Sequence, residues 1–286
     1  MRVLLCSPDS KLPNLALMKI STYHKRKGDI VGLHTEKPDL IYISVLFKNT
    51  RLVYDKNIPV IIGGPGYDET VKLPPEIEKE KPDHSLYGSK YAIGRITSGC
   101  IRHCYFCCVP KLEPNGIRFI QKPDDIWIPN TVLRLLDDNI LADEKAFNMV
   151  YSFCLKNNVT VRFEYLDFRL INIKNARMLK QMKHEYNRMY FSWDILGDEK
   201  KIINGIRILN SVGIGSYRLR VLMYIHSYDD IDSVKYRWKI LREYGCEPFL
   251  MVNPNNKDDR ITKIARKCCR LSWRNMTIEQ IFDPNY

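Results

Sequence analysis

The 286-residue sequence predicts an α/β protein. Short runs rich in Val, Ile and Leu alternate with amphipathic helical stretches along most of the chain, as in parallel strands joined by helices. A stretch rich in Pro, Glu and Lys, residues 67–90, interrupts this alternation. We therefore expect a small domain over 1–66, a linker over 67–90, a larger domain over 91–255 and a basic C-terminal extension over 256–286.

The small domain has predicted strands at residues 2–6, 40–46 and 60–62 and a predicted helix at 13–27. Pro13 lies near the first turn of that helix and Gly28 directly follows its last residue, which is the usual placement of these two residue types. The glycine turn at 63–66 lacks the spacing of a dinucleotide-binding fingerprint and indicates an ordinary strand-to-loop turn. The pattern predicts a small Rossmann-like α/β layer.

The larger domain has predicted strands at residues 91–97, 131–136, 159–166, 189–193, 217–225 and 248–252. Predicted helices lie between them at 143–156, 173–184, 199–211 and 231–244. Repeats of this kind form parallel strands with right-handed crossovers. Six such strands, where a complete barrel has about eight, predict a partial (β/α)6 TIM-type barrel.

Composition restricts where the protein works. No apolar run approaches the roughly 18–20 residues of a membrane span, and the N-terminus lacks the apolar core of a secretory signal. Nine cysteines, an odd and scattered set, argue against a disulfide scaffold. We expect a cytoplasmic protein with reduced thiols and no membrane partner.

The formal net charge is +12, and the stretch 260–274 has six basic and no acidic residues. Lys263, Lys267, Arg270 and Arg274 recur there at helical spacing. Three interpretations stay open: a solvated helix face, a docking surface for an acidic electron donor, and a surface for the phosphate backbone of a nucleic acid.

Three cysteines, Cys100, Cys104 and Cys107, have the spacing C-x3-C-x2-C, and an aromatic residue precedes the last of them. Three thiolates on one loop can hold three corners of an iron–sulfur cube and leave one iron open to a ligand. With His103, the same loop can instead form a structural zinc site of three cysteines and one histidine.

Because the cysteine motif follows the first strand of the larger domain, residues 91–255 resemble the radical S-adenosylmethionine (radical SAM) enzymes. The resemblance implies that Cys100, Cys104 and Cys107 ligate a [4Fe-4S] cluster whose open iron binds S-adenosylmethionine. One electron, from a donor such as flavodoxin or ferredoxin, would cleave the cofactor to methionine and a 5′-deoxyadenosyl radical that abstracts hydrogen from the substrate. Such an enzyme is oxygen-sensitive. The substrate is unidentified, and the basic stretch favours an anionic one, nucleic acid included.

Family members often have Gly-Gly-Glu after the second strand, where the ammonium group of the cofactor binds. This chain has Asp137, Asp138 and Asn139 there, which is similar to the Asp-Asp-Asn form of members with a cobalamin-type N-terminal domain. A carboxylate at this place still suits an ammonium group. The sequence leaves open which of the two aspartates points inward.

The resemblance implies cofactor contacts for four further residues. Phe106 would meet the adenine and Asp194 the ribose hydroxyls, while Arg169 would pair with the methionine carboxylate. Asp167, at a strand end, is a fourth candidate, although Asp167 and Arg169 can instead form a simple ion pair.

The small domain resembles a shortened, degenerate cobalamin-binding domain. Its cobalt-ligand motif, Asp-x-His-x-x-Gly, is absent, and His24 lies in a predicted helix, so we expect no cobalamin. The reaction subtype stays open. The alternative to an enzyme is a nucleic-acid-binding protein in which the cysteine loop is a zinc or iron–sulfur staple without radical chemistry.

Overall fold

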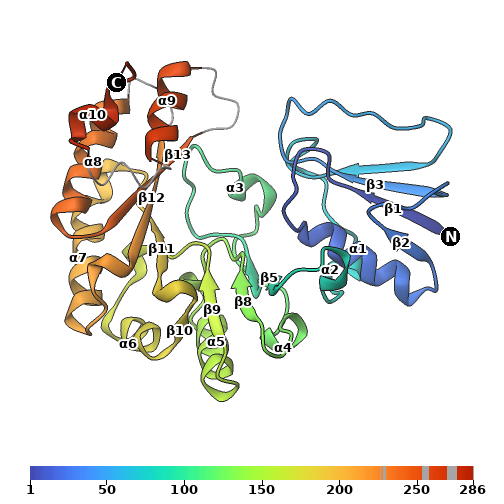
Figure 1. Ribbon diagram of the computed structural model, residues 1–286. Helices are drawn as coiled ribbons and strands as arrows, with labels where there is room; N and C mark the ends of the chain where they lie inside the picture. Colours follow the sequence, from blue (N-terminus) through green and yellow to red (C-terminus); the bar gives the residue numbers. More distant parts are fainter. Residues whose placement is uncertain (226, 228–229, 253–257, 269–275, 286) are drawn as a thin grey trace. The chain divides into compact units, whose positions relative to one another are not determined.

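The computed structural model describes residues 1–225, 227, 230–252, 258–268 and 276–285 (Figure 1). It is a mixed α/β structure with parallel sheets, which confirms the predicted class. The chain forms two compact units, Met1–Asp138 and Asn139–Tyr286. The finer domain boundaries expected from the sequence stay predictions. Within the described ranges, no helix has the length and apolar character needed to cross a bilayer.

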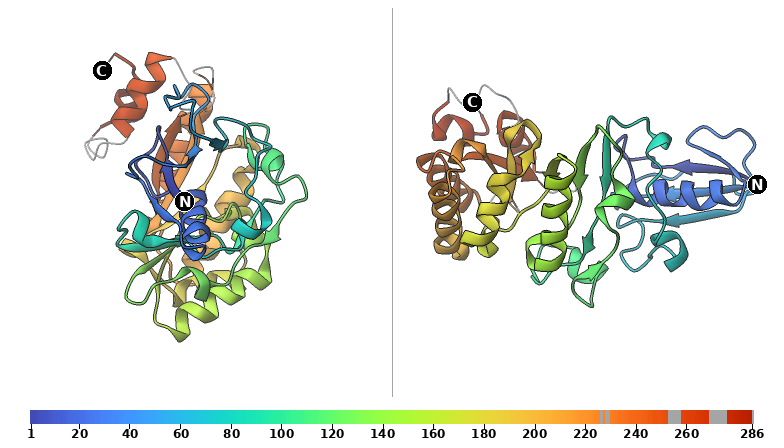
Figure 2. Two further views of the ribbon diagram at one scale, coloured as in Figure 1. Left: turned by 90° about the vertical axis from the view of Figure 1, so that its right-hand side faces the viewer. Right: turned by 90° about the horizontal axis from the view of Figure 1, so that it is seen from below.

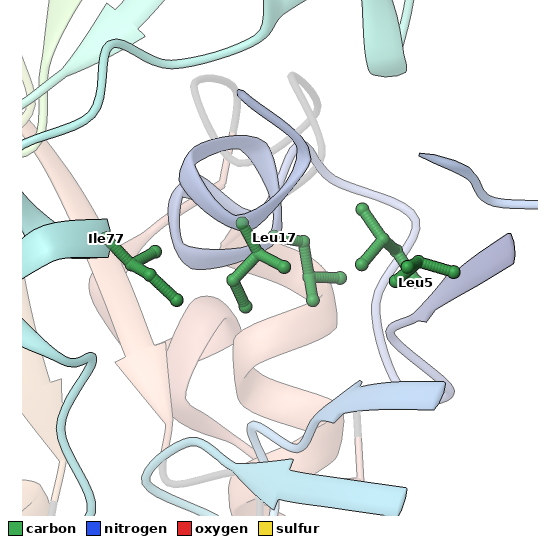
Figure 3. Close-up of a cluster of buried hydrophobic side chains, with 5 residues drawn as sticks. Leu5, Leu17 and Ile77 are labelled. Carbon is green, nitrogen blue, oxygen red and sulfur yellow. The ribbon is translucent and has the colours of Figure 1, made fainter. Parts of the chain in front are cut away.

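A four-stranded parallel sheet begins the first unit, with strands in the order β2-β1-β3-β4. Its strands are β1 (Arg2–Cys6), β2 (Ile30–Gly32), β3 (Leu40–Ser44) and β4 (Val60–Gly63). Helix α1 (Leu15–Arg26) packs on one face, where Leu5, Leu17 and Ile77 belong to a buried cluster (Figure 3). The predicted strands and helix of this region are confirmed, and the three-residue strand β2 was too short to be predicted.

The segment predicted as a linker folds against α1. It contains the short helix α2 (Pro75–Glu78) and a 3₁₀ turn, η1 (His84–Leu86). The buried Lys19 of α1 donates from Nζ to the carbonyl oxygen of Glu78 at 2.6 Å and to its carboxylate at 3.0 Å. The carboxylate of Asp83 accepts hydrogen bonds from Ser21 and Lys25. These contacts fix residues 75–86 to helix α1.

Two further strand pairs of the first unit hold the predicted cysteine loop. Strands β5 (Tyr91–Gly94) and β8 (Val132–Leu135) are parallel, and Gly94 pairs with Leu135 at their carboxyl ends. Strands β6 (Thr97–Ser98) and β7 (Arg118–Phe119) are antiparallel and join the two ends of the segment 99–117. Short helices α3 (Val109–Leu112) and α4 (Pro123–Ile126) complete this region.

The second unit contains parallel strands with helices between them. Strand β9 (Thr160–Phe163) pairs with β10 (Lys183–His184), and β12 (Leu219–Ile225) pairs with both β11 (Met189–Ser192) and β13 (Glu247–Val252). Figures 1 and 2 show the helices of this unit, which are α5 (Glu144–Lys156) before β9, and then α6 (Ile173–Gln181), α7 (Glu199–Ser211) and α8 (Ile231–Glu243) between the strands. The 3₁₀ turns are η2 (Ile140–Ala142), η3 (Phe168–Leu170), η4 (Glu185–Asn187), η5 (Leu196–Asp198) and η6 (Ser216–Arg218).

The strands and helices predicted for this unit are confirmed to within a few residues. Over the described ranges no closed barrel is seen, so the partial (β/α)6 TIM-type barrel stays a prediction. Helices α9 (Asp259–Cys268) and α10 (Ile278–Phe282) end the unit. Lys263 and Lys267 of the basic stretch lie on α9, whose apolar side chains are buried, while Arg270 and Arg274 lie outside the described residues.

Candidate functional site

The three motif cysteines lie on one loop, residues 99–117, which leaves the carboxyl end of β5 through β6 and returns through β7. Cys100, Cys104 and Cys107 are half-buried and form no disulfide, and the neighbouring Cys108 is exposed and also forms none. A loop after a parallel strand is where α/β proteins usually carry their chemistry. The structure therefore puts the motif where the sequence predicted it, directly after the strand that begins at Tyr91.

The ends of the cysteine loop are in close contact. Gly99 has a φ of +97°, and a Cβ atom built on it would lie 2.1 Å from the carbonyl oxygen of Gly116. Real Cβ atoms do not approach an oxygen so closely, so only glycine fits at position 99 with the loop closed. Gly116 also has a positive φ, +78°, but a Cβ there would meet no atom within 4 Å. The loop is thus closed at its base by the backbone itself.

Backbone amides inside the loop point at two of the three sulfurs. The N–H of Arg102 donates to Sγ of Cys100 at 3.3 Å, and the N–H of Val109 donates to Sγ of Cys107 at 3.4 Å. Such bonds favour the thiolate form and tune iron–sulfur clusters. Burial acts against the charge and, with the neighbouring thiols, raises the pKa of Cys107 to about 11.

The loop carries the types of donor that a thiolate-bound cluster uses. It supplies three thiols from one short segment, with amide donors already turned toward two of them. His103, which a zinc site on this loop would need as its fourth ligand, is exposed. Across the residues that the structure describes, no group of three or more His, Cys, Asp or Glu side chains is arranged so that it could hold a metal ion.

Asp137 follows β8 and is 2% exposed. Its Oδ1 accepts hydrogen bonds from the backbone N–H of Thr97 at 2.6 Å and from the Thr97 hydroxyl at 2.7 Å, and its Oδ2 accepts one from the N–H of Ile96 at 3.2 Å. Burial raises the pKa of Asp137 to about 6, although these hydrogen bonds and the charge of Arg95 act in the opposite direction.

Asp138 binds residues on either side of Ile96 and Thr97, namely Arg95 and Gly99. Its Oδ2 accepts hydrogen bonds from the N–H of Gly99 at 2.8 Å and from the Arg95 guanidinium at 3.3 Å, and 13% of its side chain is exposed. Alternation along β8 explains the difference, because Leu133, Leu135 and Asp137 are buried on one face. The same parity was visible in the sequence and would have predicted that Asp137 is the buried aspartate of the two.

Glu113, on the returning limb of the loop, is a residue that the sequence analysis missed. It binds Arg118 of β7 through two hydrogen bonds of 3.0 Å and accepts others from Ser98 of β6 and from Lys72. Burial raises its pKa, but these partners outweigh burial and hold the pKa at about 2. No motif marks Glu113, since its partners are distant side chains that only the folded loop brings together.

A second polar cluster lies in the second unit, after β9. The guanidinium of Arg169 donates to both carboxylate oxygens of Asp167, at 2.7 and 3.1 Å, and to Asp198 at 2.8 Å. Burial disfavours the charge, but these carboxylates raise the pKa of Arg169 above its ordinary value. The amide of Asn139 donates to Asp167 at 3.3 Å. The ion pair that the sequence left as an alternative is therefore present, with Asp198 as a third member.

Two candidate residues remain, Asp194 and Phe106. Asp194, after β11, accepts a hydrogen bond at 2.7 Å from the backbone N–H of Tyr224 in β12. Phe106, on the cysteine loop, packs edge-on against Tyr105, with ring centroids 5.2 Å apart. The carboxylate of Asp194 thus links the neighbouring strands β11 and β12 near their carboxyl ends. The cofactor contacts expected for Asp194 and Phe106 stay predictions.

Comparison with known proteins does not add to this picture: no family model matches the chain, and no curated protein matches it.

Proposed function

We propose that the chain is a radical SAM enzyme. One observation carries the proposal. A closed loop with the spacing C-x3-C-x2-C follows β5, and two successive carboxylates from the adjacent strand β8 bind the segment that enters this loop. The donor set and its place at the end of a parallel strand are what such an enzyme needs.

In this proposal Cys100, Cys104 and Cys107 hold a [4Fe-4S] cluster. Bound there, the cluster supplies the electron that splits S-adenosylmethionine into methionine and a 5′-deoxyadenosyl radical. Asp138 keeps one carboxylate oxygen, Oδ1, without a hydrogen bond from any described residue, and this oxygen is available to the cofactor's ammonium group. Phe106, on the same loop, would meet the adenine.

The remaining parts of the proposal concern the second unit and the partners. The cofactor contacts that the resemblance implies for Asn139, Asp167, Arg169 and Asp194, and the partial (β/α)6 barrel, stay predictions. A flavodoxin or ferredoxin would supply the electron in the cytoplasm, and the substrate would be anionic. We propose that the enzyme does not use cobalamin, and a contact of His24 is consistent with this. The His24 ring lies 2.7 Å from the carboxylate of Asp29 and is part of α1.

The experiment is reductive cleavage of the cofactor by protein purified and reconstituted without oxygen. With dithionite and S-adenosylmethionine, the wild type should release 5′-deoxyadenosine. Cys104→Ala should release none above the protein-free background. Cys108→Ala removes an exposed thiol next to the motif and should behave like the wild type. Equal release by the wild type and Cys104→Ala would refute the proposal.

A further inference from the structure

The segment 95–99 enters the cysteine loop where the backbone pairing of β5 with β8 stops. The last backbone hydrogen bond runs from the N–H of Leu136 to the carbonyl oxygen of Gly94 at 2.9 Å. Beyond this bond, side-chain carboxylates accept the hydrogen bonds of the backbone N–H groups. Asp137 receives the N–H groups of Ile96 and Thr97, and Asp138 receives that of Gly99. Two carboxylates thus extend the parallel ladder by three more amides.

The opposite edge of the same segment is also fixed. The N–H of Ile120 donates to the carbonyl oxygen of Ile96 at 2.8 Å, and Thr97 pairs with Phe119 of β7. The segment is therefore a short strand with backbone on one side and carboxylates on the other. Cys100 follows directly, so the direction in which the first thiol leaves this strand depends on both sides.

We propose that Asp137 is a positioning residue, which holds the entry of the cysteine loop in place through Ile96 and Thr97 so that the three thiols can bind one cluster. Asp137 accepts all three of its hydrogen bonds from this segment and is buried. A carboxylate buried in this way has no access to a ligand. The link to a cluster depends on the proposed function, whereas the restraint on the loop does not.

A carboxylate at position 137 matches the three surrounding donors better than an amide would. A carboxylate only accepts hydrogen bonds, and here both oxygens meet donors. In Asp137→Asn, one oxygen becomes an NH₂ group, so that a donor faces a backbone N–H and at least one buried amide loses its partner. The side chain keeps its size, and the core residues Leu133 and Leu135 on the same face are untouched.

The test measures hydrogen exchange of backbone amides and alkylation of thiols in the cluster-free full chain. In Asp137→Asn, the amides of Ile96 and Thr97 should exchange roughly tenfold faster or more, because a charge-assisted hydrogen bond is lost. Iodoacetamide should also modify Cys100 several-fold faster. The buried thiols Cys154 and Cys246 lie outside the loop and report general unfolding, so their rates should not change.

Asp143→Asn is the matched control, since Asp143 also accepts a backbone amide, that of Ala146, but at the start of α5. It should leave loop exchange and alkylation unchanged. If Asp137→Asn does not fold, Thr97→Val removes only the hydroxyl bond to Asp137 and should give a smaller effect in the same direction. Wild-type exchange and alkylation rates in the folded variant would overturn the proposal.

Iron loading separates this proposal from the proposed function. After anaerobic reconstitution, Asp137→Asn should hold less iron and sulfide than Asp143→Asn. If the wild type itself binds no cluster while loop exchange still rises in Asp137→Asn, then the proposed function fails and the restraint by Asp137 stands. If the wild type binds a cluster and Asp137→Asn loads it equally fast and fully, then the positioning role is wrong.

Discussion

The two glycines at the base of the cysteine loop provide a matched pair of substitutions. Both have a positive φ, +97° for Gly99 and +78° for Gly116, so alanine is strained at either position. They differ in the space around them. A Cβ at Gly99 would lie 2.1 Å from the Gly116 carbonyl oxygen, whereas a Cβ at Gly116 would have no neighbour within 4 Å.

The expected magnitudes follow from this difference. Gly116→Ala should lower the free energy of unfolding by about 1–2 kcal/mol, the usual strain of an L-residue in left-handed backbone. Gly99→Ala has similar strain and a backbone overlap that side-chain rotation cannot relieve. The loop base must then open, and the hydrogen bond from Gly99 to Asp138 and the β6–β7 pairing are weakened. We expect a total of about 3–5 kcal/mol, the range of the severe single substitutions.

Urea unfolding of the cluster-free chain, followed by circular dichroism, measures both values. Limited proteolysis between residues 99 and 117 reports local opening, and Gly99→Ala should be cut faster there than Gly116→Ala. Gly88→Ala is a further control, because Gly88 has a φ of +57° and open space but lies outside the loop. Equal destabilisation and equal cleavage in Gly99→Ala and Gly116→Ala would refute the close contact.

Three other substitutions have defined outcomes. Burial raises the pKa of Asp137 to about 6. Its ionisation should therefore lower the free energy of unfolding by about 3 kcal/mol as the pH rises from 4 to above 6. Urea unfolding should show this fall in the wild type and not in Asp137→Asn. Burial lowers the pKa of His184 to about 4, so the opposite slope, stability lost as the pH falls from about 6.5 to 4, should disappear in His184→Gln. Arg169→Met leaves Asp167 without its ion partner and should cost about 2–4 kcal/mol at pH 7, while the exposed Arg207→Met should cost less than about 1 kcal/mol.

Much of the fold followed from patterns along the chain. Strands such as β12 and helices such as α7 are long enough for their apolar period to be recognised, and glycines such as Gly28 mark where helices end. The antiparallel pair β6–β7 was not predicted. Each of its strands has two residues, too few for any period, and the pair exists because the cysteine loop closes on itself.

The cysteine motif of the candidate site was predictable from the sequence. The residues that hold the cysteine loop in place were predictable only in part. The spacing of the cysteines located the loop, and the position of Asp137 and Asp138 after a strand located the carboxylates. Glu113 and Asp198 were missed, because each is joined to its partners only by tertiary structure. Such tertiary contacts depend on how the loop closes and where the chain turns. A single sequence carries no periodic signal for either.

Iron and sulfide analysis of the anaerobically reconstituted chain tests the central claim most directly. The claim is that Cys100, Cys104 and Cys107 together hold one cluster on a loop closed at its base. We predict about four irons and about four sulfides per chain in the wild type and in Cys108→Ala, and a loss of most of both in Cys104→Ala. About one zinc and no sulfide per chain, or equal iron in the wild type and Cys104→Ala, would contradict the account.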